Sequence, residues 1–411
     1  MSNKVDLDKR NKCRICHSKN LLPFANLGCT PLADKFITVA EIEEEKSYPL
    51  EVVVCEECRL VQLNHDVDDD ELFGSDYAFF TSASPSSIKY FEDYAKDMMT
   101  RYPNQSKGFV VEIASNDGTL LQHFKKKGAR VLGIDPALPA AKMAEDNGIP
   151  TITKFFNREL ADEPLIRNAD LVLANNVIAH VTDLNDVFEG ISEILSEDGV
   201  FVFEAQYFFN LLFNSEWDHV YHEHRSFFSL TPLNILAIRN NLRIIDVVMT
   251  EGQGGSIRVS VVKKESLRAS TSNVRALLSD EERFGVNDNN LYSGFQYKTN
   301  FIKSQLPLIL KTIKSIGKTV YGYGASAKSC TLLNYCGIGP DLLPCIVDKT
   351  PYKIGKLAPG THIPVVSDVP KEPDYYLLLV WNYLPGVLKR EEKFTKDGGH
   401  FILPIPVIKV L

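Results

Sequence analysis

Three histidines, a tyrosine and two acidic residues crowd residues 217–228 of this 411-residue chain. Histidine is the side chain best suited to moving a proton near neutral pH. A catalytic metal site is a weaker interpretation, because His222 and His224 are two positions apart and would face different ways on a helix. The stretch therefore favours acid–base chemistry, with a surface or scaffold role as an equal alternative for His219 and His222.

Four cysteines near the N-terminus form two CxxC pairs, Cys13 with Cys16 and Cys55 with Cys58. Each CxxC turn lets two sulfurs reach one ion, and four thiolates complete the closed tetrahedral shell of a structural zinc site. His17 is then not needed as a ligand. The sequence predicts one structural zinc ion, and two unrelated pairs of free cysteines are the alternative.

A second chemical signature lies in mid-chain, where an apolar run enters the turn Glu112-Ile113-Ala114-Ser115-Asn116-Asp117-Gly118. Small residues let a ligand approach the backbone, and the following helix start offers free amides. Asp135, about 20 positions later, stands where an acid usually holds a ribose hydroxyl. The turn lacks the GxGxxG glycines that bind a dinucleotide, and its acids suit the cationic S-adenosylmethionine. We expect S-adenosylmethionine, with a nicotinamide dinucleotide as the rival.

Apolar runs supply the framework that must position these residues. Strands are expected from residue 109 into the turn that ends at Gly118, at 129–134, 169–174 and 199–204, and later at 319–321, 344–348, 376–381 and 398–402. They alternate with helical segments, one of them over residues 295–315, as in doubly wound parallel sheets. The pattern predicts an α/β protein in which a second strand–turn–helix unit follows the first.

Composition narrows the classes of function. The chain is 44% hydrophobic and 24% charged, as folded proteins usually are. Its net charge of −8 and its lack of a basic run argue against a nucleic-acid partner. No apolar run approaches the roughly 20 residues that span a bilayer, and the first residues do not resemble a signal peptide. We expect a monomeric cytoplasmic protein without a membrane partner.

The motifs together resemble those of the three-domain sugar C-methyltransferases, which act on nucleotide-linked 4-keto-6-deoxy sugars. Besides the cysteine pairs and the turn at 112–118, the resemblance rests on Asn175-Asn176-Val177-Ile178-Ala179-His180, Tyr221-His222-Glu223-His224, Gly254-Gly255-Ser256-Ile257-Arg258 and Tyr321-Gly322-Tyr323-Gly324-Ala325-Ser326-Ala327-Lys328. It covers nearly the whole chain. It implies a zinc-binding domain (1–70), a Rossmann-like class I methyltransferase domain (71–262) and a Rossmann-like nucleotide-sugar domain (263–411).

The resemblance implies that the methyl acceptor is a ring carbon beside a ketone, most often C3, which must first lose a proton. We expect His224 to be the base, and Tyr221 with His180 to donate hydrogen bonds to the enolate oxygen. Glu223 is expected to orient a histidine or to bind a sugar hydroxyl. The enolate carbon then attacks the sulfonium methyl in line. O- or N-methylation of a sugar and a non-enzymatic binding module are the alternatives.

The resemblance also assigns binding residues. The cofactor is expected on Glu112, Ala114, Ser115, Asn116, Asp117, Gly118, Asp135 and Asn176. The nucleotide-linked keto-sugar, of dTDP type, is expected between the central and C-terminal domains on His222, Gly322, Gly324, Ala325, Ser326 and Lys328, although packing alone is an alternative for the two glycines. Tyr77 is expected in the sugar pocket or in the core. Phe79 and Tyr383-Leu384-Pro385-Gly386 depart from the family pattern, so sugar and nucleotide stay open.

Overall fold

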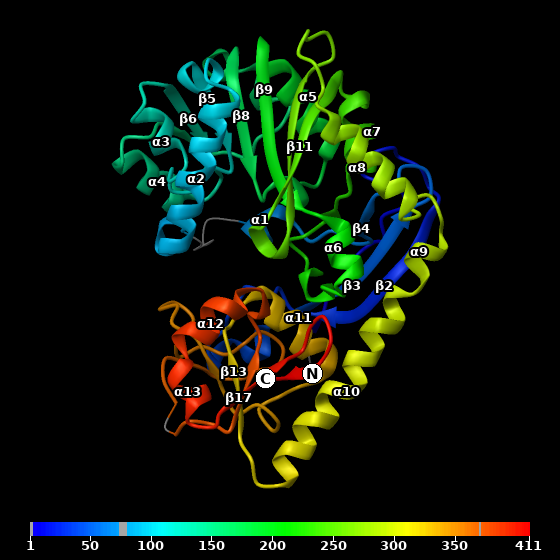
Figure 1. Cartoon of the computed structure of the whole chain (residues 1–411), viewed down its shortest axis with the longest axis vertical. Helices are drawn as coiled ribbons and strands as arrows, with labels where there is room; N and C mark the ends of the chain where they lie inside the picture. Colours follow the sequence, from blue (N-terminus) through cyan, green and yellow to red (C-terminus); the bar gives the residue numbers. More distant parts are fainter. Residues whose placement is uncertain (1–2, 74–79, 370) are drawn as a thin grey trace.

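The chain folds around three β-sheets, which the computed structural model describes for residues 3–73, 80–369 and 371–411 (Figure 1). The central and C-terminal sheets lie at opposite ends of the view, and the N-terminal strands lie beside the region between them. This arrangement confirms the predicted α/β fold with a small N-terminal unit and two Rossmann-like units. No helix among the described residues is long and apolar enough to cross a membrane.

The central sheet carries the turn at residues 114–119. Its strands, in spatial order, are β11 (Leu242–Thr250), β12 (Ser256–Lys263), β9 (Leu195–Gln206), β8 (Ala169–Asn175), β5 (Phe109–Ile113), β6 (Arg130–Ile134) and β7 (Thr151–Ile152). β12 is antiparallel to both of its neighbours, and the other pairs are parallel. The chain order reverses between β5 and β8, and ligands of such sheets bind at this reversal, beyond the carboxyl ends of the strands.

Helices cover both faces of this sheet, which explains why its inner strands are almost continuously apolar. One face carries α2 (Pro85–Arg101), α3 (Leu121–Lys125) and α4 (Leu138–Asp146), and the other carries α5 (Leu184–Ile194), α7 (Leu230–Arg239) and α8 (Ser272–Arg283) (Figure 1). Although α8 follows the domain boundary predicted at residue 262, it packs on α7 and β11. Its buried Glu281 accepts the backbone N–H groups of Leu230 and Thr231, at the start of α7.

The C-terminal sheet is a second, smaller parallel sheet. Its strands, in spatial order, are β15 (Val365–Val366), β14 (Ile346–Val347), β13 (Val320–Tyr323), β16 (Tyr375–Leu378), β17 (His400–Leu403) and the antiparallel β18 (Lys409–Val410). α10 (Phe295–Ser315) spans the residues predicted for it, and α11 (Ala327–Cys336) follows β13. β16 ends three residues earlier than predicted, and Trp381 begins the short helix η9 (Trp381–Tyr383) instead.

The N-terminal sheet joins the zinc-binding segment to the histidine-rich stretch. It contains β1 (Asn3–Lys4), β2 (Leu21–Thr30), β3 (Lys46–Cys55), β4 (Val61–Leu63) and the short β10 (Ser226–Phe227). β10 begins two residues after His224, and it pairs with β4. The histidine-rich stretch is therefore attached to the edge of the N-terminal sheet.

Candidate active site

The four cysteines of the two CxxC pairs come together as predicted. Their sulfur atoms all lie within 4.8 Å of one another, with Cys13 Sγ 3.3 Å from Cys58 Sγ and Cys16 Sγ 3.4 Å from Cys55 Sγ. Four converging thiolates fit a closed tetrahedral zinc shell, which leaves no coordination position for a substrate. The site is therefore structural.

The first CxxC turn is docked on the central unit. Asn185, in the first turn of α5, donates from Nδ2 to the carbonyl oxygens of Arg14 and Ile15, at 2.9 and 3.0 Å. Arg14 Nη1 in turn donates to the carbonyl oxygen of Thr182, 3.1 Å away. The first CxxC turn thus forms the surface against which the loop after β8 is held.

The turn after β5 has the strained geometry of a ligand-binding loop. Ala114 and Asn116 have φ values of 55° and 50°, a left-handed conformation that residues other than glycine rarely adopt. Asp135, at the end of β6, holds the turn because its carboxylate accepts the N–H groups of Asn116 (2.8 Å) and Ala137 (2.9 Å). Asp135 and the turn are thus brought together, as the sequence predicts.

The side chains of Asn116 and Asp117, in the same turn, accept hydrogen bonds from backbone N–H groups of the short helix η2 (Thr81–Ala83). Thr81 N–H donates to Asn116 Oδ1 at 2.8 Å, and Ser82 N–H donates to Asp117 Oδ2 at 2.7 Å. The chain leading into α2 therefore lies across this turn. Tyr77, four residues before Thr81, lies outside the described residues.

Several polar atoms around the turn are buried without a hydrogen-bond partner among the described residues. They are Glu112 Oε2, Ser115 Oγ, both amide atoms of Asn175, and Gln206 Nε2. Glu112, Asn175 and Gln206 lie at the carboxyl ends of β5, β8 and β9. Burial raises the pKa of Glu112, the nearby Asp135 and Asp117 charges add to the effect, and the Asn175 side chain beside it opposes the effect. Because buried polar groups are normally paired, these atoms mark a place for a polar, cationic ligand, and the amino-acid part of S-adenosylmethionine fits them.

Two members of this set, Asn175 and Gln206, were not singled out as cofactor residues from the sequence. Asn175 is the last residue of β8, which borders the reversal in chain order, and Gln206 is the last residue of the neighbouring β9. Asn176, which was predicted, follows directly with a left-handed φ of 55°. A polar residue that ends a buried strand was the available signal.

His224 forms a defined hydrogen-bonded arrangement with its neighbours. Its Nδ1 lies 2.8 Å from the carbonyl oxygen of His219, and its Nε2 lies 2.8 Å from Tyr221 Oη. A carbonyl oxygen only accepts, so Nδ1 carries the proton and Nε2 accepts the Tyr221 O–H. Burial lowers the pKa of His224 to about 4, which keeps the imidazole uncharged at neutral pH. The His224 side chain is partly exposed and uncharged, so its imidazole is able to accept a proton.

His180 connects the residues at the end of β8 to the His224 imidazole. It ends the short helix η6 (Ile178–His180), five residues after Asn175. Its ring stacks between Phe73 and His224, with centroid distances of 5.5 and 5.2 Å. Burial lowers the pKa of His180, so this ring is also neutral. His180, Tyr221 and His224 are thus brought together, as expected.

The residue after the imidazole, Arg225, fastens the site to the zinc-binding unit. Its buried guanidinium donates to the carboxylate of Asp69, to the carbonyl oxygen of Val67 at 2.6 Å and to that of His180 at 2.8 Å. Sequence reasoning missed this residue. Its position directly after the histidines was the only signal.

The other two members of the Tyr221–His224 motif face elsewhere. His222 is fully buried, and its Nε2 lies 3.3 Å from the carbonyl oxygen of Pro49 in β3. Glu223 faces Asp34 and Lys353; burial and the Asp34 charge raise its pKa, while Lys353 lowers it. His222, predicted as a substrate contact, is therefore placed against the zinc-binding unit.

In the C-terminal unit, packing occupies most of the predicted substrate residues. A Cβ on Gly322 would lie 2.9 Å from Ile346, and one on Gly324 would lie 2.5 Å from Val380. Ala325 N–H donates to Asp348 Oδ2 at 2.7 Å. The local fold thus already explains the small residues of this turn.

Ser326 and Lys328 follow in the same motif. Ser326 caps α11, because its Oγ accepts the Ser329 N–H while Ser329 Oγ accepts the Ser326 N–H. Lys328 Nζ donates to Asn382 Oδ1 at 2.7 Å, and Asp218 and Glu216 partly offset the burial that lowers its pKa. Lys328 alone of the predicted C-terminal residues is brought toward the histidine-rich stretch.

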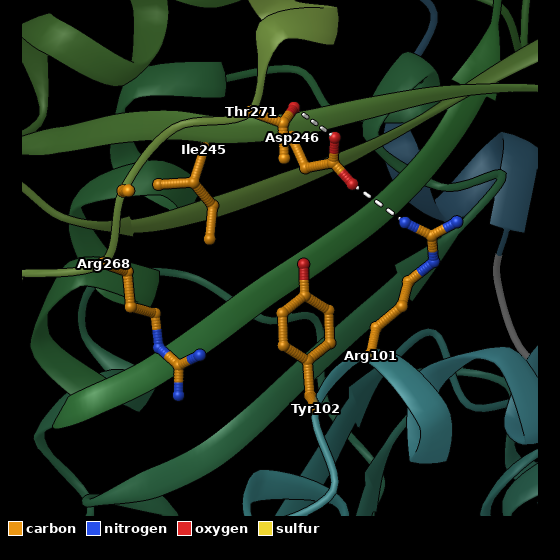
Figure 2. A pocket seen from close by; sticks show the side chains of 7 residues that line it. Arg101, Tyr102, Ile245, Asp246, Arg268 and Thr271 are labelled. Carbon is orange, nitrogen blue, oxygen red and sulfur yellow. Dashed lines mark hydrogen bonds and ion pairs between the residues drawn. The ribbon is translucent and has the colours of Figure 1, made fainter.

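A pocket of about 340 Å³ lies elsewhere, at the β11 edge of the central sheet (Figure 2). Asp246 there accepts Arg101 Nη1 at 2.9 Å and Thr271 Oγ1 at 2.6 Å, and Tyr102 and Arg268 complete the lining (Figure 2). Three strands, β12, β9 and β8, lie between β11 and β5, so the pocket is distinct from the residues described above.

Family models match three successive parts of the chain: a zinc binding domain (13–73), a methyltransferase domain (88–247) and a C-methyltransferase C-terminal domain (251–406). The C-methyltransferase NovU of Streptomyces niveus is 36% identical over 409 residues, which are 98% of this chain and 97% of that protein. The chain belongs to the three-domain C-methyltransferases. This C-methyltransferase therefore uses S-adenosylmethionine and binds zinc, and the alternatives of O- or N-methylation and of a non-enzymatic module are not supported.

Solved structures resemble part of this C-methyltransferase weakly. A magnesium protoporphyrin IX methyltransferase from Synechocystis is 13% identical, with a TM-score of 0.33, over 43% of this chain and 79% of its own. The PH0226 protein from Pyrococcus horikoshii is 14% identical, with a TM-score of 0.37, over 46% of this chain and 97% of its own. Likeness this weak adds nothing to the family assignment.

Proposed function

We propose that this C-methyltransferase methylates a ring carbon, C3, of a nucleotide-linked 4-keto-6-deoxy sugar of dTDP type. The observation that carries the proposal is the neutral imidazole of His224, with its unprotonated Nε2 beside Tyr221 and the ring of His180. A carbon next to a ketone must lose a proton before it can attack a methyl group, and an uncharged, oriented imidazole suits this step.

In the proposed reaction the Tyr221 O–H turns from His224 Nε2 to the ketone oxygen of the bound sugar, and the freed Nε2 takes the proton from the carbon beside the ketone. The electrons of the C–H bond move to the carbonyl oxygen, where the Tyr221 O–H and the His180 ring N–H stabilise the negative charge. S-adenosylmethionine supplies an electrophilic methyl group. The new C–C bond forms as the S–CH₃ bond breaks, and S-adenosylhomocysteine leaves while His224 later releases its proton to solvent.

The placement of cofactor and sugar follows from the same contacts. Glu112 and Asn175 would hold the amino-acid part of the cofactor, and Asp135 its ribose. The sugar would lie toward Tyr221 and His224, and Glu223, which faces Asp34 and Lys353, would reach a sugar hydroxyl only at the side of the site next to those two residues. The domain limits at residues 70 and 262 remain part of this proposal.

The first test identifies which nucleotide-linked sugars accept a methyl group and which carbon carries it. The zinc-loaded enzyme is incubated with ¹³C-methyl S-adenosylmethionine and a panel of dTDP-, UDP- and GDP-linked sugars with and without a 4-keto group. We expect a gain of one methylene only with dTDP-linked keto-sugars, and ¹³C NMR should place the methyl on C3. Transfer to no keto-sugar, or to another position, would contradict the proposal.

A second experiment measures the removal of the C3 proton directly. With S-adenosylhomocysteine in place of the methyl donor, the enzyme in D₂O should exchange the hydrogen on C3 of the keto-sugar. Exchange should disappear when His224 becomes Asn. Methylation without any such exchange in the wild type would remove the enolate step.

A further inference from the structure

The C-terminal unit touches the histidine-rich stretch at the short helix η7 (Trp217–His219). Trp381 Nε1, from η9, donates to Asp218 Oδ2 at 2.7 Å. Thr331 Oγ1, from α11, donates to the carbonyl oxygen of Val220 at 2.9 Å. Asp218 and Val220 are the two neighbours of His219 in sequence.

His219 supplies the carbonyl oxygen that accepts the His224 Nδ1–H. Each neighbour of His219 is thus held by a donor from the C-terminal unit. Asp218 and Thr331 are 1% and 2% exposed, so breaking either bond would leave a buried polar group unpaired. The direction of the carbonyl therefore depends on contacts made by a different unit of the protein.

We infer that Trp381 and Thr331 are positioning residues for His224. By holding Asp218 and Val220 they aim the His219 carbonyl at Nδ1, which keeps the proton on Nδ1 and the lone pair on Nε2. Neither residue is needed to contact the substrate for this role. The consequence for catalysis rests on the proposed function of His224 as base, whereas the tautomer itself does not.

The zinc-binding unit holds the other end of the same stretch. Arg225 and β10 fix the residues after His224, as described above. The base is therefore placed between two anchors, and only the one before it controls the tautomer. A misdirected or wrongly protonated imidazole in a comparable role costs roughly 10²-fold or more in rate.

The experiment uses the full-length zinc-loaded enzyme labelled with ¹⁵N-histidine. Two-bond ¹⁵N–¹H NMR correlation distinguishes a protonated from an unprotonated ring nitrogen, and the His224→Asn spectrum assigns the His224 signals. We expect the wild type to carry the proton on Nδ1. In Trp381→Phe/Thr331→Val the signals should shift toward the other tautomer, with kcat about 10²-fold lower and the KM for S-adenosylmethionine unchanged.

Tyr335→Phe is the matched control. The Tyr335 ring contacts Trp217 at 5.2 Å, but its hydroxyl bonds to Asn300 and Gln296 within the C-terminal unit. This variant should leave both tautomer and kcat unchanged. Should the double variant fold poorly, judged by zinc content and thermal unfolding, Thr331→Val alone provides the test.

An unchanged Nδ1–H signal together with unchanged kcat in the folded variants would overturn the inference, as would a wild-type His224 protonated on Nε2. If the tautomer shifts but the D₂O exchange experiment fails, the positioning role stands and the proposed base does not. The two ideas can therefore fail separately.

Discussion

His222 and His224 stand two residues apart in one motif, yet the structure uses them in opposite ways. His222 is 2% exposed, bonds to the Pro49 carbonyl of β3, and meets the Tyr48 ring edge-on at 5.7 Å. His224 is partly exposed and faces His180 and Tyr221. One imidazole is part of the contact with the zinc-binding unit, and the other is open to a ligand.

The acidity of the two side chains does not distinguish them. Burial lowers the pKa of both to about 4. A shifted pKa therefore identifies neither as the base, although such shifts often accompany function. The distinguishing features are the exposure of the side chain and the residues that it contacts.

The largest expected difference between the two histidines is in turnover. His224→Asn should lower kcat by about 10² to 10⁴-fold, because it removes the group that takes the proton. His222→Gln keeps an N–H donor for the Pro49 carbonyl, so it should leave kcat near the wild-type value. Steady-state methyl transfer from labelled S-adenosylmethionine measures both. The comparison breaks if His222→Gln loses as much activity as His224→Asn.

The next difference concerns stability against pH. The folded pKa of His222 is about 4 and its ordinary value is 6.5, so the unfolded chain binds more protons between these values. Stability from this residue is present above pH 6.5 and is lost as the pH falls toward 4, by about 2 kcal/mol between pH 7.5 and pH 5. Urea unfolding of the wild type and of His222→Gln at both pH values checks this.

In that experiment the variant should lose less free energy of unfolding than the wild type on acidification. Loss of zinc at low pH affects both proteins alike, so the difference isolates the imidazole. Equal losses would mean that His222 is not held neutral by its burial against β3.

Local patterns were enough to predict much of this molecule. The strand Phe109–Ile113 begins at the predicted residue and the helix Phe295–Ser315 has the predicted bounds, because periodicity and composition act over a few residues. The two CxxC pairs converge because each turn already presents two sulfurs. The turn after β5 and Asp135 meet because parallel strands end at the same edge of the sheet.

The contacts that orient His224 could not be predicted in this way. Trp381 meets Asp218 across 163 positions, and Thr331 meets Val220 across 111. No periodic pattern links such partners, because they depend on how two folded units dock. Local sequence also could not tell His222 from His224, since a turn between them sends the two rings to different units.

The two strand–turn–helix motifs also differ in whether their polar side chains already have hydrogen-bond partners within the protein. At the end of β5, Glu112 and Ser115 have buried side-chain atoms without a hydrogen-bond partner among the described residues. After β13, in contrast, the Ser326 hydroxyl caps α11. Asp135 and Asp348 pin the two turns in the same manner. A helix start therefore does not by itself identify a phosphate site, because a cap uses the same amides.

Ser326→Ala should show the smallest effect, a loss of about 1 kcal/mol in the free energy of unfolding, as expected for a lost helix cap. Because the hydroxyl is already used within the protein, the KM values for S-adenosylmethionine and for the nucleotide-sugar should not change. Glu112→Gln is the counterpart after β5, and it should weaken S-adenosylmethionine binding by roughly 10- to 100-fold, because it removes a charge-assisted hydrogen bond. Urea unfolding and calorimetric titration measure these effects. A large rise in the nucleotide-sugar KM of Ser326→Ala at unchanged stability would show that this turn binds ligand too, and the contrast between the two motifs would then fail.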